Sequence, residues 1–261
     1  MRILLIGDLV GRPGRTAVKQ LVPALRAELQ LDVVIANAEN VAGGKGITPE
    51  TMTELLANGV DVITTGDHVF DQRTAMQALE NPRVLRPANF PPGTPGAGWF
   101  LLERPGVPAL AVVNVLGRVF MKPADCPFRA LEAILAELAG RTPCILVDIH
   151  AEATSEKIAM GWAFDGRVSA VLGTHTHVPT ADARILPHGT ACMTDVGMTG
   201  AHASVLGRVT HAVVAHFYTG TPHKFELAEG DVQLHGALVE IDEATGRAVA
   251  ITPVARTLPA M

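Results

Sequence analysis

Six short runs of apolar, largely β-branched residues predict the strands of a central sheet. They span residues 2–7, 32–38, 61–66, 109–115, 144–149 and 169–174. Runs that are apolar on both faces are typical of strands covered by helices on each side. Apolar residues spaced three and four apart predict the covering helices, over 15–30, 48–59, 71–80 and 127–140. Because strands and helices alternate, the pattern indicates an α/β fold.

The last third of the chain follows a different rhythm. Residues 181–197 and 225–255 predict paired antiparallel strands, the second pair turning at 243–246. Residues 210–218 fit either a strand or a short helix, and the pattern alone does not decide between them. We therefore expect mixed sheets in a layered sandwich.

Length and composition fit one large domain. A chain of 261 residues with 48% apolar residues can bury an ample core. The Pro/Gly-rich stretch 87–99 is too short for a domain linker, so we expect residues 1–261 to form a single domain. The net charge of −5 argues against a broad basic surface for duplex nucleic acid, whereas small phosphorylated molecules remain suitable ligands.

The cysteines and the opening residues bear on the compartment. Cys126, Cys144 and Cys192 form no C-x-x-C pair, so they predict neither a disulfide framework nor a thiolate zinc site. The opening apolar run, residues 2–7, is far too short to span a membrane. We therefore expect a cytoplasmic protein without a membrane partner.

Residues that can bind metals follow five of the predicted strands. They are Asp8, Glu39, Asn40, Asp67, His68, His150, His175 and His177. The carboxyl ends of strands in open α/β sheets meet at one crevice, so residues far apart in sequence converge there. Carboxylates, an amide and imidazoles without a thiolate suit divalent manganese, iron or zinc. The sequence therefore predicts a metal site at this edge.

So many ligands exceed the needs of one ion and fit two. Two ions roughly 3.5–4 Å apart form the usual clamp for in-line displacement at phosphorus. In an extended backbone, residues two apart point to the same side, about 6.6 Å from each other. An extended His175-Thr176-His177 segment would thus give one histidine to each ion.

Each strand-end residue also has a simpler interpretation when taken alone. Asp8 could cap the helix that follows it, and His150 could be a hydrogen-bonded core histidine. Asp67 and His68 could form a turn, while Glu39 could open the glycine-rich turn after it. The agreement of five strand ends favours the metal site over these separate explanations.

Cations and aromatic residues near the same loops are weaker signals. The glycine loops at 7–15 and 42–46 lack the spacing of a nucleotide P-loop. Four cations on loops after the strands fit either phosphate contacts or solvated surface charge: Arg12, Arg15, Lys45 and Arg118. Aromatic residues make up only 4% of the chain, and we expect those near the motifs, Phe70, Phe120 and Trp162, to lie in the core. Weak base selectivity would follow.

The motifs resemble those of the YmdB-like metallophosphoesterases, a branch of the calcineurin-like superfamily. The resemblance covers nearly the whole chain and is carried by "GDLVGRPGR", "NAENVAGGKGIT", "TTGDHVFD", "VDIHAEATSEK", "VLGTHTHVPTAD" and "TDVGMTG". It implies an α-β-β-α sandwich with mixed sheets inside and helices outside. It also implies a dinuclear phosphodiesterase that uses iron or manganese and converts 2′,3′-cyclic nucleotides to 3′-nucleotides by attack of a metal-held hydroxide.

The resemblance assigns a role to each strand-end residue. It implies that Asp8, Asn40 and His177 bind one ion, that Asp67, His150 and His175 bind the other, and that Glu39 bridges them. His68 would be the general acid, and Arg12, Lys45 and Arg118 could contact the substrate. One position departs from the family, which usually has Asn where this chain has Asp67. The centre would then be one unit less positive, and its water would be acidified less.

Other functions remain compatible with these residues. A phosphomonoesterase of broad specificity would use the same centre, and a metal-bound regulatory scaffold would act through RNA-related partners. An amidohydrolase also uses H-x-H, but there the motif follows the first barrel strand, whereas here it follows the last strand of the parallel run. The apolar strands near the C-terminus could complete the core or form a homo-oligomer interface.

Overall fold

The computed structural model describes residues 1–259 and contains two β-sheets that pack face to face. The first sheet has the order β2-β11-β12-β1-β3-β4, with β13 beside β12. Its strands are β1 Arg2–Ile6, β2 Asp8–Leu9, β3 Val33–Asn37, β4 Val62–Thr64, β11 Met198–Ala201, β12 Val232–Ile241 and β13 Ala248–Thr257. The second sheet has the order β5-β6-β7-β8-β10-β9. Its strands are β5 Trp99–Arg104, β6 Val107–Leu116, β7 Ile145–His150, β8 Ala170–Thr174, β9 Arg184–Ile185 and β10 Ala191–Met193.

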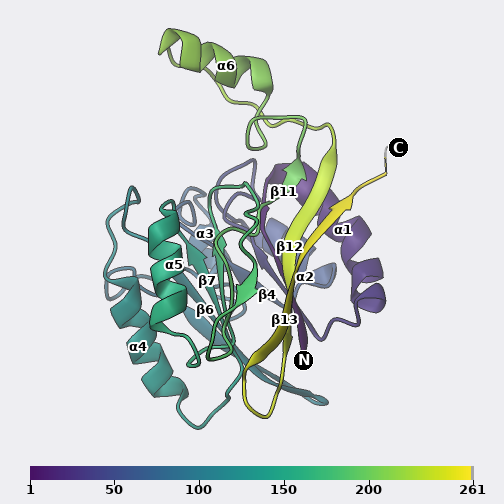
Figure 1. Ribbon diagram of the computed structural model, residues 1–261. Helices are drawn as coiled ribbons and strands as arrows, with labels where there is room; N and C mark the ends of the chain where they lie inside the picture. Colours follow the sequence, from purple (N-terminus) through teal and green to yellow (C-terminus); the bar gives the residue numbers. More distant parts are fainter. Residues whose placement is uncertain (260–261) are drawn as a thin grey trace.

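Helices cover the outer face of each sheet, as Figure 1 shows. The first sheet carries α1 Gly11–Glu28, α2 Pro49–Ala57 and α3 Ala75–Ala78, and the second carries α4 Pro127–Leu138 and α5 Thr154–Ala163. One apolar cluster joins the inner faces of the two sheets. A second cluster lies between the first sheet and its helices, and a third lies between the second sheet and its helices. These layers confirm the predicted α-β-β-α sandwich with helices outside.

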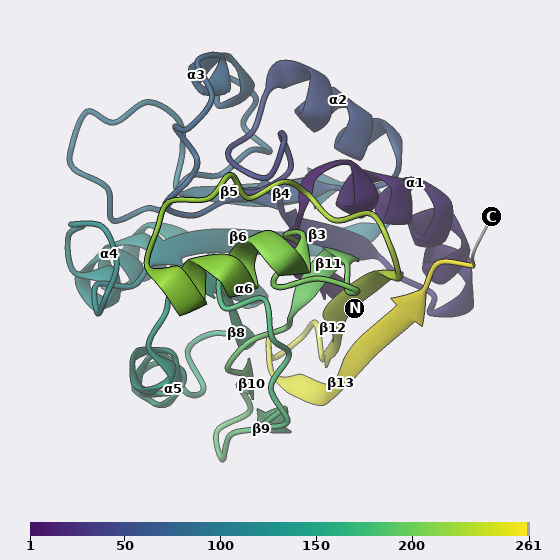
Figure 2. The ribbon, with the colours of Figure 1, turned by 90° about the horizontal axis from the view of Figure 1, so that it is seen from above.

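The helices and strands expected from the pattern are largely present. All six predicted apolar runs form strands, and β9–β10 and β12–β13 pair antiparallel as expected. Residues 210–218 resolve as a helix, α6 Thr210–Thr219, which ends at Gly220 in the left-handed conformation. Figures 1 and 2 show α6 standing outside the layers, beyond the ends of the strands.

The helix predicted over 71–80 is much shorter in the structure. Only Ala75–Ala78 are helical, because the preceding side chains serve tertiary contacts. Asp71 accepts from His68 Nδ1, and Gln72 Nε2 donates to two carbonyls of the 42–45 loop. Helix α5 and strand β5 were not predicted from the pattern.

The parallel strands of the two sheets end at the same edge of the sandwich. In the first sheet β1, β3 and β4 are parallel, and in the second β6, β7 and β8 are parallel. Their carboxyl ends place the loops of both sheets side by side, which positions the candidate site. No helix in the described part of the chain is both long and apolar enough to cross a bilayer.

Candidate metal centre

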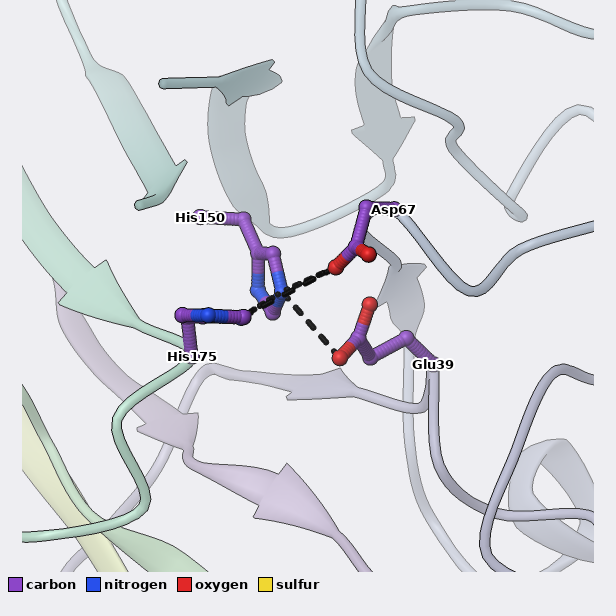
Figure 3. A group of neighbouring side chains, drawn as sticks. All are labelled: Glu39, Asp67, His150 and His175. Carbon is purple, nitrogen blue, oxygen red and sulfur yellow. Dashed lines mark hydrogen bonds and ion pairs between the residues drawn. The ribbon is translucent and has the colours of Figure 1, made fainter. Parts of the chain in front are cut away.

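Four ligand side chains from both sheets converge at the shared edge. One ligand atom from each of Glu39, Asp67, His150 and His175 lies within 4.8 Å of all the others. Figure 3 shows the two carboxylates facing the two imidazoles. His150 Nε2 lies 3.1 Å from Glu39 Oε1, and His175 Nδ1 lies 3.0 Å from His150 Nε2. Residues separated by more than a hundred positions thus form one polar cluster.

Asp8, Asn40 and His177 extend this cluster. Asp8 Oδ2 accepts from the backbone N–H of His175 at 3.0 Å. Asn40 Nδ2 lies 2.9 Å from Glu39 Oε1 and 3.3 Å from His177 Nε2. Glu39 therefore contacts both groups of residues that the resemblance assigns to separate ions. Asp8 does not cap a helix, because α1 is capped at Val10 without a side-chain hydrogen bond.

Several buried polar atoms in the cluster have no hydrogen-bond partner. Within residues 1–259 these include Asp8 Oδ1, Asp67 Oδ1 and His177 Nδ1. A buried carboxylate oxygen without a partner is costly, so each such atom requires an explanation. Cations bound by oxygen and imidazole ligands supply one, and this donor set suits iron, manganese or zinc. The residues present therefore fit a metal centre.

The electrostatics of the cluster prepare some of the residues for metal binding and not others. Burial opposes the charge on His150, but the adjacent Glu39 raises the pKa of this imidazole, so a metal bound there must displace its proton. Burial opposes the charge on Glu39, but the adjacent His150 lowers the pKa of this carboxyl to about 2. Burial lowers the pKa of His177 to about 4 and also lowers the pKa of His175, so both are neutral at pH 7, as metal binding requires. Burial raises the pKa of Asp8 to about 8, so this carboxyl needs a nearby cation to be ionised at neutral pH.

A buried network below His150 fixes the orientation of its ring. The Thr174 hydroxyl donates to Asp148 Oδ1 at 2.8 Å and lies 2.9 Å from His150 Nδ1. Because Thr174 gives its proton to Asp148, its oxygen accepts from Nδ1–H of His150. Asn37 also donates to Asp148, at 3.0 Å. Nε2 of His150 is then the nitrogen left for a metal, and its partners orient the ligand.

The H-x-H segment is not extended, so that prediction was wrong. His175 has φ 99° and His177 has φ 67°, a left-handed region that side chains other than glycine rarely adopt. Asp195 holds this bend, since its Oδ2 accepts from the backbone N–H of Thr176 at 3.0 Å and from the Thr176 hydroxyl at 2.8 Å. Lys157 donates to the same oxygen at 2.9 Å, and both members of the ion pair are buried. The two histidines reach the cluster through this bend.

Asp195→Asn is expected to weaken metal binding by about 10–100-fold, because loss of a residue that orients ligands has effects of this size. Titration of the apo protein with manganese measures the change. Thr176→Val is the matched control, since it removes the hydroxyl bond but keeps the N–H bond, and its cost is expected to be smaller. Wild-type affinity in Asp195→Asn would show that the bend does not depend on this carboxylate.

His68 lies at the rim of the same cluster. Its Nδ1 lies 2.8 Å from Asp71 Oδ2, and its backbone N–H donates to Glu39 Oε2 at 3.2 Å. Its side chain lines the surface cleft together with Lys45, Thr176 and His177. The Asp71 contact leaves Nε2 of His68 as the nitrogen that is available to a bound molecule.

Comparison with known proteins agrees with this geometry. Residues 4–254 match the YmdB-like protein family. The chain is a member of this family. A 2′,3′-cyclic-nucleotide 2′-phosphodiesterase from Bacillus subtilis (strain 168) is 49% identical over 252 residues, which cover 96% of this chain and 95% of that protein.

Two crystal structures resemble the whole of this YmdB-like chain. One is of a hypothetical protein from Thermus thermophilus, with a TM-score of 0.93 and 46% identity, covering 99% of this chain and 100% of that one. The other is of a phosphatase from Mycoplasma pneumoniae, described as novel, with a TM-score of 0.92 and 32% identity, covering 98% and 93%. A two-sheet sandwich with H-x-H after β8 also excludes the barrel of an amidohydrolase.

The cations predicted near the site of this YmdB-like protein are placed differently from one another. Lys45 lines the cleft, whereas Arg12 and Arg118 are exposed and are not among the residues that line it. Arg15 is committed elsewhere, with Nε 2.6 Å from Glu54 Oε2. Sequence reasoning missed Arg208, which lines the cleft from the loop before α6.

The aromatic residues near the motifs are not in the core, contrary to expectation. Phe70, Phe120 and Trp162 are 41%, 89% and 52% exposed, because Phe70 and Phe120 lie on loops outside the apolar clusters and Trp162 lies on an exposed side of α5. None of the three is among the residues that line the cleft with the candidate ligands. Their positions are consistent with weak base selectivity.

Proposed function

We propose that this protein is a metal-dependent phosphodiesterase that opens 2′,3′-cyclic nucleotides to 3′-nucleotides. The observation that carries the proposal is the convergence of seven oxygen- and nitrogen-bearing ligands, with Glu39 between the two groups. The substrate class is supported by 49% identity to the Bacillus subtilis 2′,3′-cyclic-nucleotide 2′-phosphodiesterase.

Two divalent ions per chain, iron or manganese, fit this donor set. Asp8, Asn40 and His177 would hold one ion and Asp67, His150 and His175 the other, with Glu39 shared. When bound, such ions neutralise the phosphate charge and activate water as the nucleophile. The side chains of the two sheets supply the fixed geometry, since every candidate ligand lies at the end of a strand or within a few residues of one.

His68 would protonate the leaving oxygen of the opened ring. Asp71 accepts from its Nδ1 and so orients the ring with Nε2 toward the substrate. A general acid placed in this way typically contributes about 10²–10⁴-fold to the rate. Release of the 2′ oxygen would give the 3′-monophosphate, whose second negative charge distinguishes product from substrate.

Lys122 partly offsets the extra negative charge of Asp67. Its Nζ lies 3.3 Å from Asp67 Oδ2 and donates to the Asp67 carbonyl at 2.6 Å. Removing the carboxylate by Asp67→Asn makes the centre more positive and favours ionisation of the nucleophile. We expect the acid limb of the pH–rate profile to move down by up to about one unit.

Lys122→Met is the matched variant for this prediction. It removes a positive charge at the same place, so the acid limb is expected to move to higher pH. Profiles of kcat/KM between pH 5 and 9 measure both shifts. An acid limb that stays at the wild-type pH in Asp67→Asn, with metals bound, would contradict the role given to this charge.

Broad phosphomonoesterase activity is the main alternative. Comparing the rates on a diester and on a monoester distinguishes it from phosphodiesterase activity. We propose that manganese-loaded protein hydrolyses bis(p-nitrophenyl) phosphate faster than p-nitrophenyl phosphate, because a ring-opening enzyme must act on a diester. Faster hydrolysis of the monoester would favour the alternative. A regulatory scaffold would instead retain its biological effect in an inactive His68 variant.

Three further properties belong to this proposal. We propose that residues 1–261 act as one metallophosphoesterase domain, supported by ligands that come from both sheets and by a core shared between them. We propose a cytoplasmic protein, as the sparse and separated cysteines suggest, with no stable duplex nucleic acid partner. A homo-oligomer is compatible with the proposed function, and analytical ultracentrifugation would determine the oligomeric state.

A further inference from the structure

Arg208 is a half-buried cation whose side-chain hydrogen bonds, within residues 1–259, go only to backbone carbonyls. It lies on the loop between β11 and α6. Its Nη2 donates to the Gly44 carbonyl at 2.7 Å and its Nη1 to the Phe225 carbonyl at 3.3 Å. Within residues 1–259 no carboxylate forms an ion pair with it, although burial lowers its pKa and so makes the charge costly.

The absence of a side chain at Gly44 leaves space for this guanidinium in the lining of the cleft. Gly44 has φ +91°, and a Cβ at this position would lie 2.6 Å from both Nη atoms of Arg208. The positive φ favours glycine at this position, and a larger residue would also require the guanidinium to shift. The 42–46 loop and the Arg208 loop therefore contact each other at the cleft that the candidate ligands line.

A half-buried guanidinium without a carboxylate partner is suited to binding an anion. Arginine carries five N–H donors in a planar fork that matches two oxygens of a phosphate group. Two carbonyls hold Arg208 in place, and the donors that remain are available to a ligand. Arg208 shares the lining of the cleft with Lys45, His177 and His68, so a phosphate bound at the metal centre lies within the same cleft.

We propose that Arg208 is a substrate-binding residue that binds the phosphate group and favours ligands with more negative charge. This inference rests on the proposed function and deepens it. The nearby Lys45 adds a second positive charge to the same rim. Since the monoester product carries one more negative charge than the cyclic diester, Arg208 binds product and inorganic phosphate more strongly than substrate.

The test compares Arg208→Ala and Arg208→Lys with wild type, all loaded with manganese. Arg208→Ala is expected to raise KM for 2′,3′-cyclic AMP by roughly 10–100-fold, with a smaller change in kcat, since it removes a charge-assisted bond. The Kd of inorganic phosphate, measured by calorimetry, is expected to rise by a similar factor. Arg208→Lys keeps the charge but not the fork, so it recovers only part of both losses.

Arg256→Ala is the matched control, because Arg256 pairs with Glu28 on an exposed surface of β13. Its KM and phosphate affinity are expected to equal those of wild type. Unchanged KM and phosphate affinity in both Arg208 variants, with a lower Tm, would overturn the proposal and make Arg208 a tie between two loops. A KM increase that accompanies loss of metal would overturn it as well.

The phosphate measurement separates this inference from the proposed function. If wild type binds phosphate but does not hydrolyse 2′,3′-cyclic AMP, the proposed function fails, and weaker phosphate binding in Arg208→Ala still supports the role of Arg208. If wild type hydrolyses the cyclic nucleotide and Arg208→Ala binds phosphate as wild type does, only the inference about Arg208 fails.

Discussion

His68→Ala is expected to lower kcat for 2′,3′-cyclic AMP by about 10²–10⁴-fold while leaving the metal content unchanged. The reason is its position at the rim, where the imidazole bonds Asp71 and lies outside the four-residue ligand cluster. Removing it deprives the leaving oxygen of its proton donor without removing a ligand. Steady-state kinetics together with elemental analysis of the purified protein measures both quantities.

A substrate with a better leaving group tests the role of His68 more sharply. p-Nitrophenolate departs without a proton, so His68→Ala is expected to lose much less activity on bis(p-nitrophenyl) phosphate than on the cyclic nucleotide. Asp71→Asn is the matched variant, since it weakens the Nδ1 contact and is expected to cost less than His68→Ala. Loss of metal from His68→Ala would identify this residue as a ligand instead.

Glu39→Gln is expected to abolish turnover, with a loss of at least about 10³-fold, and to reduce the bound metal. Glu39 is buried, and its Oε1 contacts both His150 and Asn40, which belong to the two halves of the centre. An amide of the same shape removes the negative charge that two adjacent cations require, and a loss of several kcal/mol in transition-state stabilisation corresponds to a factor of this size.

Metal titration and kinetics on the same preparation check this prediction. Glu152→Gln is the control, because Glu152 also faces the cluster, 3.2 Å from His175 Nε2, but is half-exposed. It is expected to keep both metal and most of the activity. If the Glu39→Gln variant binds two ions with wild-type affinity, the proposal that Glu39 bridges the two ions is contradicted.

The sequence was sufficient to predict which strand ends bring their polar side chains together. Asp8, Glu39 and His150 follow apolar runs, and parallel strands bring their ends to one edge whatever the details of packing. Runs that are apolar on both faces also explain why a layered sandwich of mixed sheets was predicted correctly, whereas the α-β-β-α arrangement was implied by the family resemblance. The strand pairs near the C-terminus were also predictable, since alternation and a turn suffice there.

The conformations within the site could not be predicted in this way. The bend at His175 and His177 depends on Asp195, whose side chain comes from a later segment and is paired with Lys157 on α5. Local pattern reports alternation along the chain, not such tertiary hydrogen bonds. Arg208 was missed for the same reason, because only the fold brings its loop against Gly44.

The most direct test is to identify the product that manganese-loaded protein makes from 2′,3′-cyclic AMP. Chromatography against 2′-AMP and 3′-AMP standards, with a metal-free sample in parallel, gives both the reaction and its metal dependence. Metal-dependent formation of 3′-AMP alone is the predicted result. No hydrolysis with both ions bound, or release of 2′-AMP, would contradict it.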